Sequence, residues 1–346
     1  MIRERMGILP DCRAFDVYGY RFRVCGSSEP AVQGVGHDFA FFRTQSAGDE
    51  VNIEMREEEP DYDDLPVCDA SVYTPRNTAY RNGDKSYVDF HGRGLGVHDP
   101  KGRSFRIISR DPYLLYEASY LFLLSQIGEA LDRKRMHRIH CLGVSVNGRA
   151  VLALLPMGGG KSTLGASLLR QPDVKLLSDD SPLVDVQGKV HAFPLHLGLL
   201  TGAEGEVPEE HRRLVKRMEF GPKYLVNYEF FADRVCPDAD PGIVFLGHRT
   251  LSKECRIEPA TLRSGVRAMV ANAVIGMGLF QGLEYILRSS PWELAGKAHT
   301  GCSRFFNCYR LLRQSRICHL HLGRDLDKNA QAVVEFARRV RHGGRR

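Results

Sequence analysis

Residues 151–164 read VLALLPMGGGKSTL, and this short stretch guides the interpretation of the whole chain. It opens with apolar residues typical of a buried strand, and the residues after Lys161 follow a helical pattern. Between them, Gly158, Gly159 and Gly160 permit backbone angles that turn successive amide groups toward one point. Such amides at a helix start, together with the helix dipole, favour a bound phosphate. The stretch therefore predicts a strand, a phosphate-binding loop and a helix, as in an α/β fold.

Three polar side chains at the end of this loop suit a nucleotide triphosphate. Lys161 supplies a positive charge for the outer phosphates, Ser162 carries a hydroxyl that can bind Mg²⁺, and Thr163 follows directly. Leu155 stands where the usual pattern G-x-x-x-x-G-K-[ST] has its first glycine. The alternative is a glycine-rich turn with an incidental lysine. We expect nucleotide binding, with ATP and Mg²⁺.

A second predicted strand, at residues 174–177, leads into two adjacent carboxylates. Asp179 and Asp180 follow Lys161 by eighteen and nineteen residues. A short helix and a return connection would bring this strand alongside the first, with its carboxyl end beside the loop. One carboxylate could then hold the metal, and the other could accept a proton from an attacking hydroxyl. The alternative is a polar turn before the next strand.

Residues 137 to 193 resemble the catalytic core of HPr kinase/phosphorylase and its kinase relatives. The resemblance depends on HCLGVSVNGRAV at 140–151, GGGKST at 158–163 and SDD at 178–180. In that family a histidine begins a strand, a β-hairpin leads into the phosphate-binding loop, and an Asp-Asp pair follows the first helix. The resemblance implies a P-loop kinase core with a nucleotide-binding fold related to that of ATP-dependent phosphoenolpyruvate carboxykinases.

The same resemblance implies roles for individual residues. The loop glycines would wrap phosphate, the loop lysine would neutralise it, and the loop serine would bind Mg²⁺. Asp179 would be the base that orients the acceptor hydroxyl, Asp180 would support the metal, and His140 would lie near the reacting phosphate. For His140 the alternative is packing at a strand start. The family's Arg-Gly-Leu-Gly-type signature has only a loose echo at 194–199, so HPr itself is not the expected substrate.

The chain as a whole divides into three predicted segments. Residues 1–110 form a smaller β-rich N-terminal domain, because apolar residues recur there with a period of two. The acidic run at 57–64 interrupts this pattern and is interpreted as a solvated loop. Residues 111–136 form a connecting helix, and residues 137–346 form the kinase domain. Further helices are predicted near 162–170, 208–218, 260–288 and 327–341.

Two more groups of basic residues are candidates for phosphate contacts. Lys223, in a predicted turn, could contact nucleotide or acceptor phosphate, and Arg212 and Arg213 could serve similarly; the alternative is solvation. Five arginines lie within residues 338–346. We interpret them as a helix end and a solvated terminus, with an anionic partner such as RNA as the alternative.

His319 and His321 form a separate candidate. They fall on one face of a predicted strand and could bind a metal ion, but the sequence offers no third ligand nearby.

Composition excludes several classes of protein. The 346 residues suggest about two domains, and 43% hydrophobic with 26% charged residues argue against disorder and fibrous architectures. The net charge, 48 − 42 = +6, permits nucleic-acid contact without arguing for it. Nine cysteines, an odd number without a C-x-x-C pair, argue against a disulfide framework or a cysteine-rich zinc site and predict a reducing, cytoplasmic compartment. No apolar stretch approaches about 18 residues, and no signal peptide is evident, so no membrane association is expected.

These observations predict an ATP- and Mg²⁺-dependent kinase that transfers the γ-phosphoryl group to a hydroxyl of a peptide, protein or small molecule. Analogy with the family suggests a homo-oligomer. The first alternative is a nucleotide-gated binding module or ATPase switch that forms no phosphorylated product. The second is a phosphoenolpyruvate carboxykinase, which needs a metal-binding histidine and lysine and a carboxylate-binding arginine that the sequence does not place.

Overall fold

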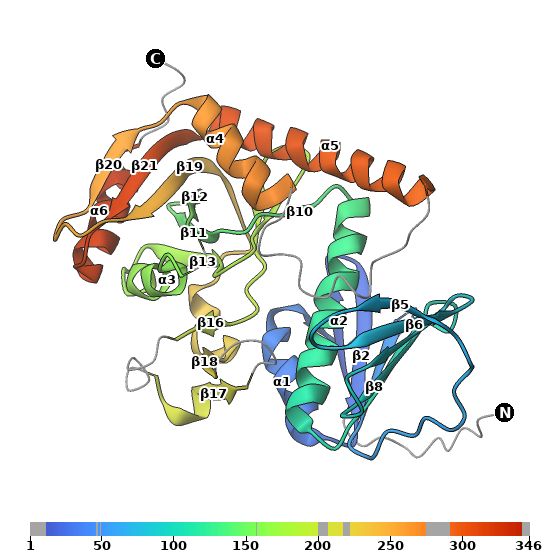
Figure 1. Ribbon diagram of the computed structural model, residues 1–346. Coiled ribbons are helices and arrows are strands. Elements are labelled where there is room, and N and C mark those ends of the chain that lie inside the picture. Colours follow the sequence, from blue (N-terminus) through green and yellow to red (C-terminus); the bar gives the residue numbers. More distant parts are fainter. Residues whose placement is uncertain are drawn as a thin grey trace. The chain divides into compact units, whose positions relative to one another are not determined.

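The computed structural model describes residues 12–45, 48, 50–156, 158–199, 207–216, 222–274 and 291–340, the side chains of 291–297 excepted. The fold is mixed α/β, as the sequence predicts. The described residues form two compact units (Figure 1). The first holds the residues up to Ala130 with the described part of 214–223, and the second holds the remainder from Leu131 onward.

The first unit is built on a nine-stranded sheet in the order β3-β1-β2-β4-β9-β8-β7-β6-β5. The acidic run at 57–64 lies outside these strands and is largely exposed, which confirms the predicted loop. The strands are β1 (Cys12–Val17), β2 (Tyr20–Gly26), β3 (Arg43–Thr44), β4 (Val51–Arg56), β5 (Ala70–Tyr73), β6 (Thr78–Asn82), β7 (Lys85–Asp89), β8 (Leu95–Asp99) and β9 (Ser104–Ile108).

Two helices belong to this unit, and one of them was not predicted. α2 (Pro112–Arg133) confirms that a helix lies in the segment 111–136, and its Phe122 stacks on Phe105 of the sheet with ring centroids 4.0 Å apart. α1 (Glu29–Asp38) lies where the sequence suggested strands. Its valines and glycines are weak helix formers, so its packing rather than its propensity stabilises it. A Cβ on Gly34 would lie 2.7 Å from the ring of Tyr116, which shows how closely the two helices approach.

A disulfide joins Cys12 and Cys25, a pair that the cysteine spacing did not predict. The two residues are directly opposed in the antiparallel β1–β2 ladder, with Cα atoms 4.4 Å apart. Thirteen residues separate them in sequence, so only strand pairing reveals the pair. The expectation of a reducing, cytoplasmic compartment therefore loses the observation on which it rested. The remaining cysteines are free thiols: Cys68, Cys141, Cys236, Cys255, Cys302, Cys308 and Cys318.

The second unit contains a sheet in the order β10-β14-β15-β19-β12-β11-β13, with β21 paired to β19 and β20 paired to β21. β12, β19 and β21 are mutually parallel neighbours. The strands are β10 (His137–Arg138), β11 (Leu142–Val146), β12 (Arg149–Leu154), β13 (Val174–Ser178), β14 (Leu183–Val184), β15 (Val190–His191), β19 (Asp238–Arg249), β20 (Arg256–Pro259) and β21 (Arg316–Leu322).

Helices cover both faces of this sheet (Figure 1). On one face, Leu164 and Val333 share a buried core with Phe245 of β19. On the other face, a Cβ on Gly265 would meet Ile317 of β21 at 2.9 Å and Leu312 at 3.1 Å. The helices on the first face are α3 (Lys161–Leu169) and α6 (Leu326–Arg339), and those on the second are α4 (Leu262–Met269) and α5 (Pro291–Gln314).

The predicted helix at 208–218 is wrong. The chain there forms one 3₁₀ turn, Glu209–His211, and then β17 (Arg212–Val215). β17 pairs within a three-stranded sheet in the order β16-β18-β17, where β16 is Leu197–Gly198 and β18 is Lys223–Val226. The charged run suggested a surface helix, but pairing and the burial of Val215 favour an extended backbone.

The other predicted helices are found in part. α3 and α6 match 162–170 and 327–341 to within two residues at each end. Of 260–288, the structure describes α4 and a π-helix at Val270–Val274, and the rest lies outside the described residues. The arginines beyond residue 340 also lie outside them. In the part of the chain that the structure describes, no helix has the length and apolar character needed to cross a membrane.

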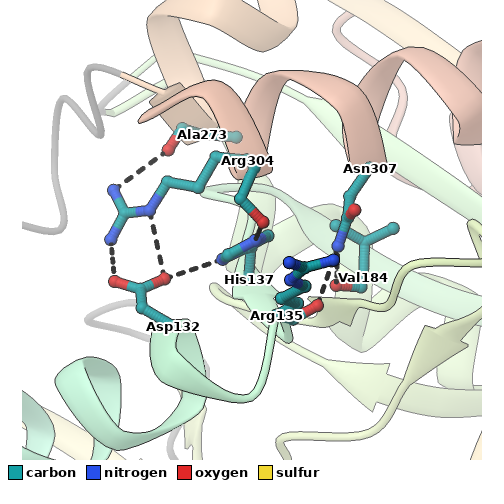
Figure 2. Close-up of polar contacts among 8 residues, drawn as sticks. Asp132, Arg135, His137, Val184, Ala273, Arg304 and Asn307 are labelled. Atoms are coloured by element: carbon teal, nitrogen blue, oxygen red, sulfur yellow. Dashed lines mark hydrogen bonds and ion pairs between the residues drawn. The ribbon is translucent and has the colours of Figure 1, made fainter. Parts of the chain in front are cut away.

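A partly buried ion-pair network joins the end of α2 to α5 (Figure 2). His137 is fully buried, and its Nδ1 donates to Asp132 Oδ1 at 2.8 Å while its Nε2 lies 2.9 Å from Ser303 Oγ. Arg304 donates to the same carboxylate through Nε at 3.1 Å and Nη2 at 2.5 Å. Burial alone would raise the pKa of Asp132, but these hydrogen bonds outweigh it and hold that pKa below its usual value.

Asp132→Ala is expected to destabilise the fold by about 3 kcal/mol, because it leaves the partly buried Arg304 and the fully buried His137 without their carboxylate partner. The pKa of Asp132 in the folded state is lower than its unfolded-state value of 3.8. The variant should therefore lose the full amount of unfolding free energy above pH 3.8, and this loss should become smaller as the pH falls through the folded-state pKa. Urea unfolding across this range measures it. The matched control is Asp327→Ala, which removes an exposed pair with Arg170 and should cost less than about 1 kcal/mol. Equal losses in the two variants would contradict the assignment.

Candidate functional site

The predicted phosphate-binding loop follows a β-hairpin, an order of elements that the sequence resemblance implied. β11 and β12 pair in antiparallel register from Val146 and Arg149 back to Leu142 and Ala153. Asn147 and Gly148 form the turn with φ of 52° and 76°, the positive angles that a two-residue hairpin requires. β12 lies between β19 and β11 in the sheet, and the loop connects the end of β12 to the start of α3.

The loop backbone leaves an open concave surface. Gly158 and Gly160 have φ of 71° and 94°, and a Cβ placed on either would meet no atom within 4 Å. Gly159 differs, because a Cβ there would lie 2.8 Å from the carbonyl oxygen of Pro156. Two glycines therefore provide the left-handed angles and the third allows a tight turn.

Leu155, which replaces the first glycine of the usual pattern, has a packing role. It is 2% exposed and belongs to the core of this unit. A Cβ on Gly247 of β19 would lie 2.3 Å from Leu155 Cδ2, so the missing side chain on β19 makes room for the leucine. The substitution is thus compensated in the neighbouring strand, and the carbonyl oxygen of Leu155 still accepts a hydrogen bond from Lys161 Nζ at 3.1 Å.

Lys161, His140 and Asp180 meet at one end of the loop. Lys161 Nζ donates to His140 Nε2 at 2.9 Å and lies 4.0 Å from Asp180 Oδ1. His140 Nδ1 is buried and has no hydrogen-bond partner, since Asp180 Oδ1 lies 3.4 Å away in poor alignment. The Asp180 side chain is 54% exposed. This end of the loop therefore combines a cation, an imidazole and an accessible carboxylate.

Asp179 occupies a different position from its neighbour. It is buried, and its Oδ2 accepts hydrogen bonds from Ser162 Oγ at 3.0 Å and from the Gly198 amide at 3.3 Å. No sequence signal indicates that Gly198, nineteen residues away, contacts this carboxylate. A carboxylate bonded to the loop hydroxyl is the arrangement that holds Mg²⁺ in P-loop nucleotide-binding proteins.

The path that brings Asp179 to the loop differs from the prediction. β13 does not lie alongside β12, because β11 pairs with both and separates them. β11 is antiparallel to each neighbour, so β12 and β13 still run in the same direction and end at the same edge of the sheet. The carboxylates therefore reach the loop from one strand farther away than expected.

A depression of about 300 Å³, open mouth included, adjoins the loop. Its lining includes Gly159, Gly160 and Thr163 from the loop and the start of α3, together with Arg249, Leu322 and Leu326. Arg249 ends β19, and its guanidinium is exposed. Sequence reasoning missed this arginine because nothing in residues 240–250 marks it, and only the parallel pairing of β12 and β19 places it near the loop.

The remaining basic candidates are Lys223, Arg212 and Arg213. Lys223 opens β18 and groups with the first unit, whereas the loop belongs to the second. Arg212 lies over the ring of Tyr224 at 5.8 Å and pairs with Glu209 at 3.2 Å. Lys223 and Arg213 therefore stay predictions, and Arg212 has local partners that account for it.

A third histidine lies beside the two histidines that the sequence indicated as a possible metal site. His319 and His321 of β21 lie beside His248 of β19, which was not a candidate. Burial, followed by the two neighbouring rings, lowers the pKa of His248 below its usual value. This cluster is separate from the loop.

No protein-family model matches this chain, and a search of curated proteins also finds no match.

Proposed function

We propose that this protein is an ATP- and Mg²⁺-dependent kinase of the HPr kinase-like type that phosphorylates a hydroxyl group. The observation that supports this most is the placement of two carboxylates with different surroundings at one phosphate-binding loop. Asp179 is buried against Ser162, and Asp180 is exposed beside His140 and Lys161. A binding module needs the first arrangement only, whereas phosphoryl transfer to a hydroxyl also uses the second.

The residues present fit a bound nucleotide and its metal. The space over Gly158 and Gly160 is open, and the buried Nδ1 of His140 makes no hydrogen bond, although Asp180 Oδ1 lies 3.4 Å from it. Ser162 and Asp179 provide the hard oxygen ligands that Mg²⁺ prefers. When bound, Mg²⁺ would neutralise charge on the outer phosphates.

These surroundings favour roles for the two aspartates that are the reverse of those implied by the sequence resemblance. Asp179, held by Ser162, supports the metal. Asp180 faces the reacting end of the loop, where it orients the acceptor hydroxyl and takes up its proton as the oxygen bonds to the γ-phosphorus and the bond to the β-phosphate oxygen breaks. Lys161 and the loop amides stabilise the charge on the phosphates during this exchange.

A ³¹P NMR experiment in H₂¹⁸O tests the proposal. The protein is incubated with Mg·ATP and pools of hydroxyl acceptors, namely serine- and threonine-containing peptides, polyols and sugars. A kinase produces ADP together with a phosphomonoester that contains no ¹⁸O. Production of ADP with only ¹⁸O-labelled inorganic phosphate in every pool would support a hydrolytic switch and contradict the proposal.

Arg249→Ala is expected to weaken ATP binding by about tenfold, the effect of losing one charged hydrogen bond or stacking contact. The residue after the loop serine, Thr163, faces the same depression as Arg249, so this side is suited to the nucleoside and α-phosphate. Isothermal titration with Mg·ATP and with Mg·tripolyphosphate measures the effect, which should be larger for ATP. The control is Arg263→Ala, an exposed arginine on α4 across the sheet. An unchanged affinity in Arg249→Ala would remove this residue from the site.

A further inference from the structure

Three histidines form a compact triangle at the carboxyl end of β19 and β21. The ring centroids of His248 and His319 lie 6.0 Å apart, those of His248 and His321 lie 5.9 Å apart, and those of His319 and His321 lie 6.2 Å apart. His248 is directly opposite His321 in the parallel ladder. The set thus combines a His-x-His pair on one strand with a third histidine on its neighbour.

The triangle lies on the face of the sheet opposite to the phosphate-binding loop. Side chains alternate between the two faces along a strand. Phe245 and Leu322 belong to the core beneath α3 and α6, and Arg249 and Leu322 line the depression beside the loop. His248 and His321 are the sequence neighbours of Arg249 and Leu322, so they project to the other side.

We propose that His248, His319 and His321 bind one divalent transition-metal ion, such as Zn²⁺, at a site independent of the nucleotide. Imidazole is a preferred ligand for such ions and a poor one for Mg²⁺. Three neutral histidines leave a fourth coordination position for water or another oxygen ligand.

Glu258 of β20 is placed to contribute to this site. It is opposite His319 in the antiparallel β20–β21 ladder, and its Oε2 lies 3.8 Å from His321 Nε2. Arg256 is opposite His321, but its Nη2 pairs with Glu258 Oε1 at 3.1 Å. Arg256, the cation that the described strand register places beside the rings, is therefore already paired with the carboxylate of Glu258.

Binding requires a modest closure of the three rings. Among the described residues, no group of three or more His, Cys, Asp or Glu side chains already has metal-site spacing. Rings around one Zn²⁺, with Zn–N bonds of about 2.0–2.1 Å, would have centroids roughly 5 Å apart. Rotation of partly exposed side chains on fixed strands can supply this difference of about 1 Å.

Cobalt titration of the full chain tests the site. Co²⁺ replaces Zn²⁺ and gives visible d–d absorption, and a Cys302→Ser background removes the exposed thiol on α5. The proposal predicts one Co²⁺ per chain, without the thiolate charge-transfer band, and a higher unfolding temperature with Co²⁺ bound. His248→Ala and His321→Gln should each weaken Co²⁺ binding by at least about tenfold.

The control variant is His299→Ala, an exposed histidine on α5 outside the triangle, which should bind Co²⁺ like the parent. Mg·ATP affinity, measured in the same variants, should stay unchanged, so the result does not depend on the kinase proposal. Co²⁺ binding that is absent in the parent, or equal in His248→Ala, His321→Gln and His299→Ala, would overturn the site.

Discussion

Lys161→Ala is expected to weaken Mg·ATP binding by about 10- to 100-fold, since it removes a charged hydrogen-bond donor from the phosphates. The side chain is only 10% exposed, and it extends toward His140 at the loop rather than toward bulk solvent. Phosphoryl transfer should fall further, by about 100- to 1,000-fold beyond the change in binding, because the charge that develops on the phosphates then lacks a preorganised partner. Calorimetry and a coupled ADP assay measure the two effects separately.

Lys175→Ala provides the matched control for this variant. Lys175 is an exposed lysine on β13 of the same unit, and its removal should change neither quantity. Lys161 also holds the carbonyl oxygen of Leu155, so urea unfolding of both variants separates a local loss of fold from a loss of ligand contacts. Wild-type ATP affinity in a folded Lys161→Ala protein would contradict nucleotide binding at this loop.

Asp180→Asn is expected to reduce turnover by about 100- to 10,000-fold while leaving ATP affinity nearly unchanged, the signature of a lost base. Its side chain is half exposed, so the change should not disturb the fold. Asp179→Asn should behave differently, because Asp179 lies against Ser162 and supports the metal. We expect that variant to require much more Mg²⁺ for half-maximal ATP binding.

Steady-state assays over a Mg²⁺ series distinguish these two carboxylates. If Asp179→Asn loses turnover at every Mg²⁺ concentration with unchanged metal dependence, and Asp180→Asn needs more Mg²⁺ to reach full turnover, the roles are those implied by the sequence resemblance. If Asp180→Asn instead lowers ATP affinity as much as turnover, the proposed base is wrong.

Much of the loop could be predicted from sequence because its signals are local. A buried strand, three glycines and a helix start follow one another within residues 151–164, and the structure places β12 and α3 on either side of the loop as expected. The connecting helix was equally clear, since apolar residues recur at helical spacing through α2. Local periodicity carries such information without any knowledge of the rest of the fold.

Contacts that depend on strand order could not be predicted in this way. The insertion of β11 between β12 and β13, the approach of Arg249 to the loop, and the meeting of His248 with His319 all follow from the order of strands in the sheet. The Cys12–Cys25 disulfide has the same origin in β1–β2 pairing. The predictions for the short segments 208–218 and α1 were wrong for a related reason. Their charged or glycine-containing sequences have weak secondary-structure propensities, and packing overrides these propensities.

A crystal structure with Mg²⁺ and a non-hydrolysable ATP analogue would test the proposed site most directly. The account predicts the triphosphate on the amides of 158–163, Mg²⁺ beside Ser162 and Asp179, and Asp180 facing the γ-phosphate with room for an acceptor. An analogue bound elsewhere in the second unit, or a metal held by Asp180 and not by Asp179, would contradict it.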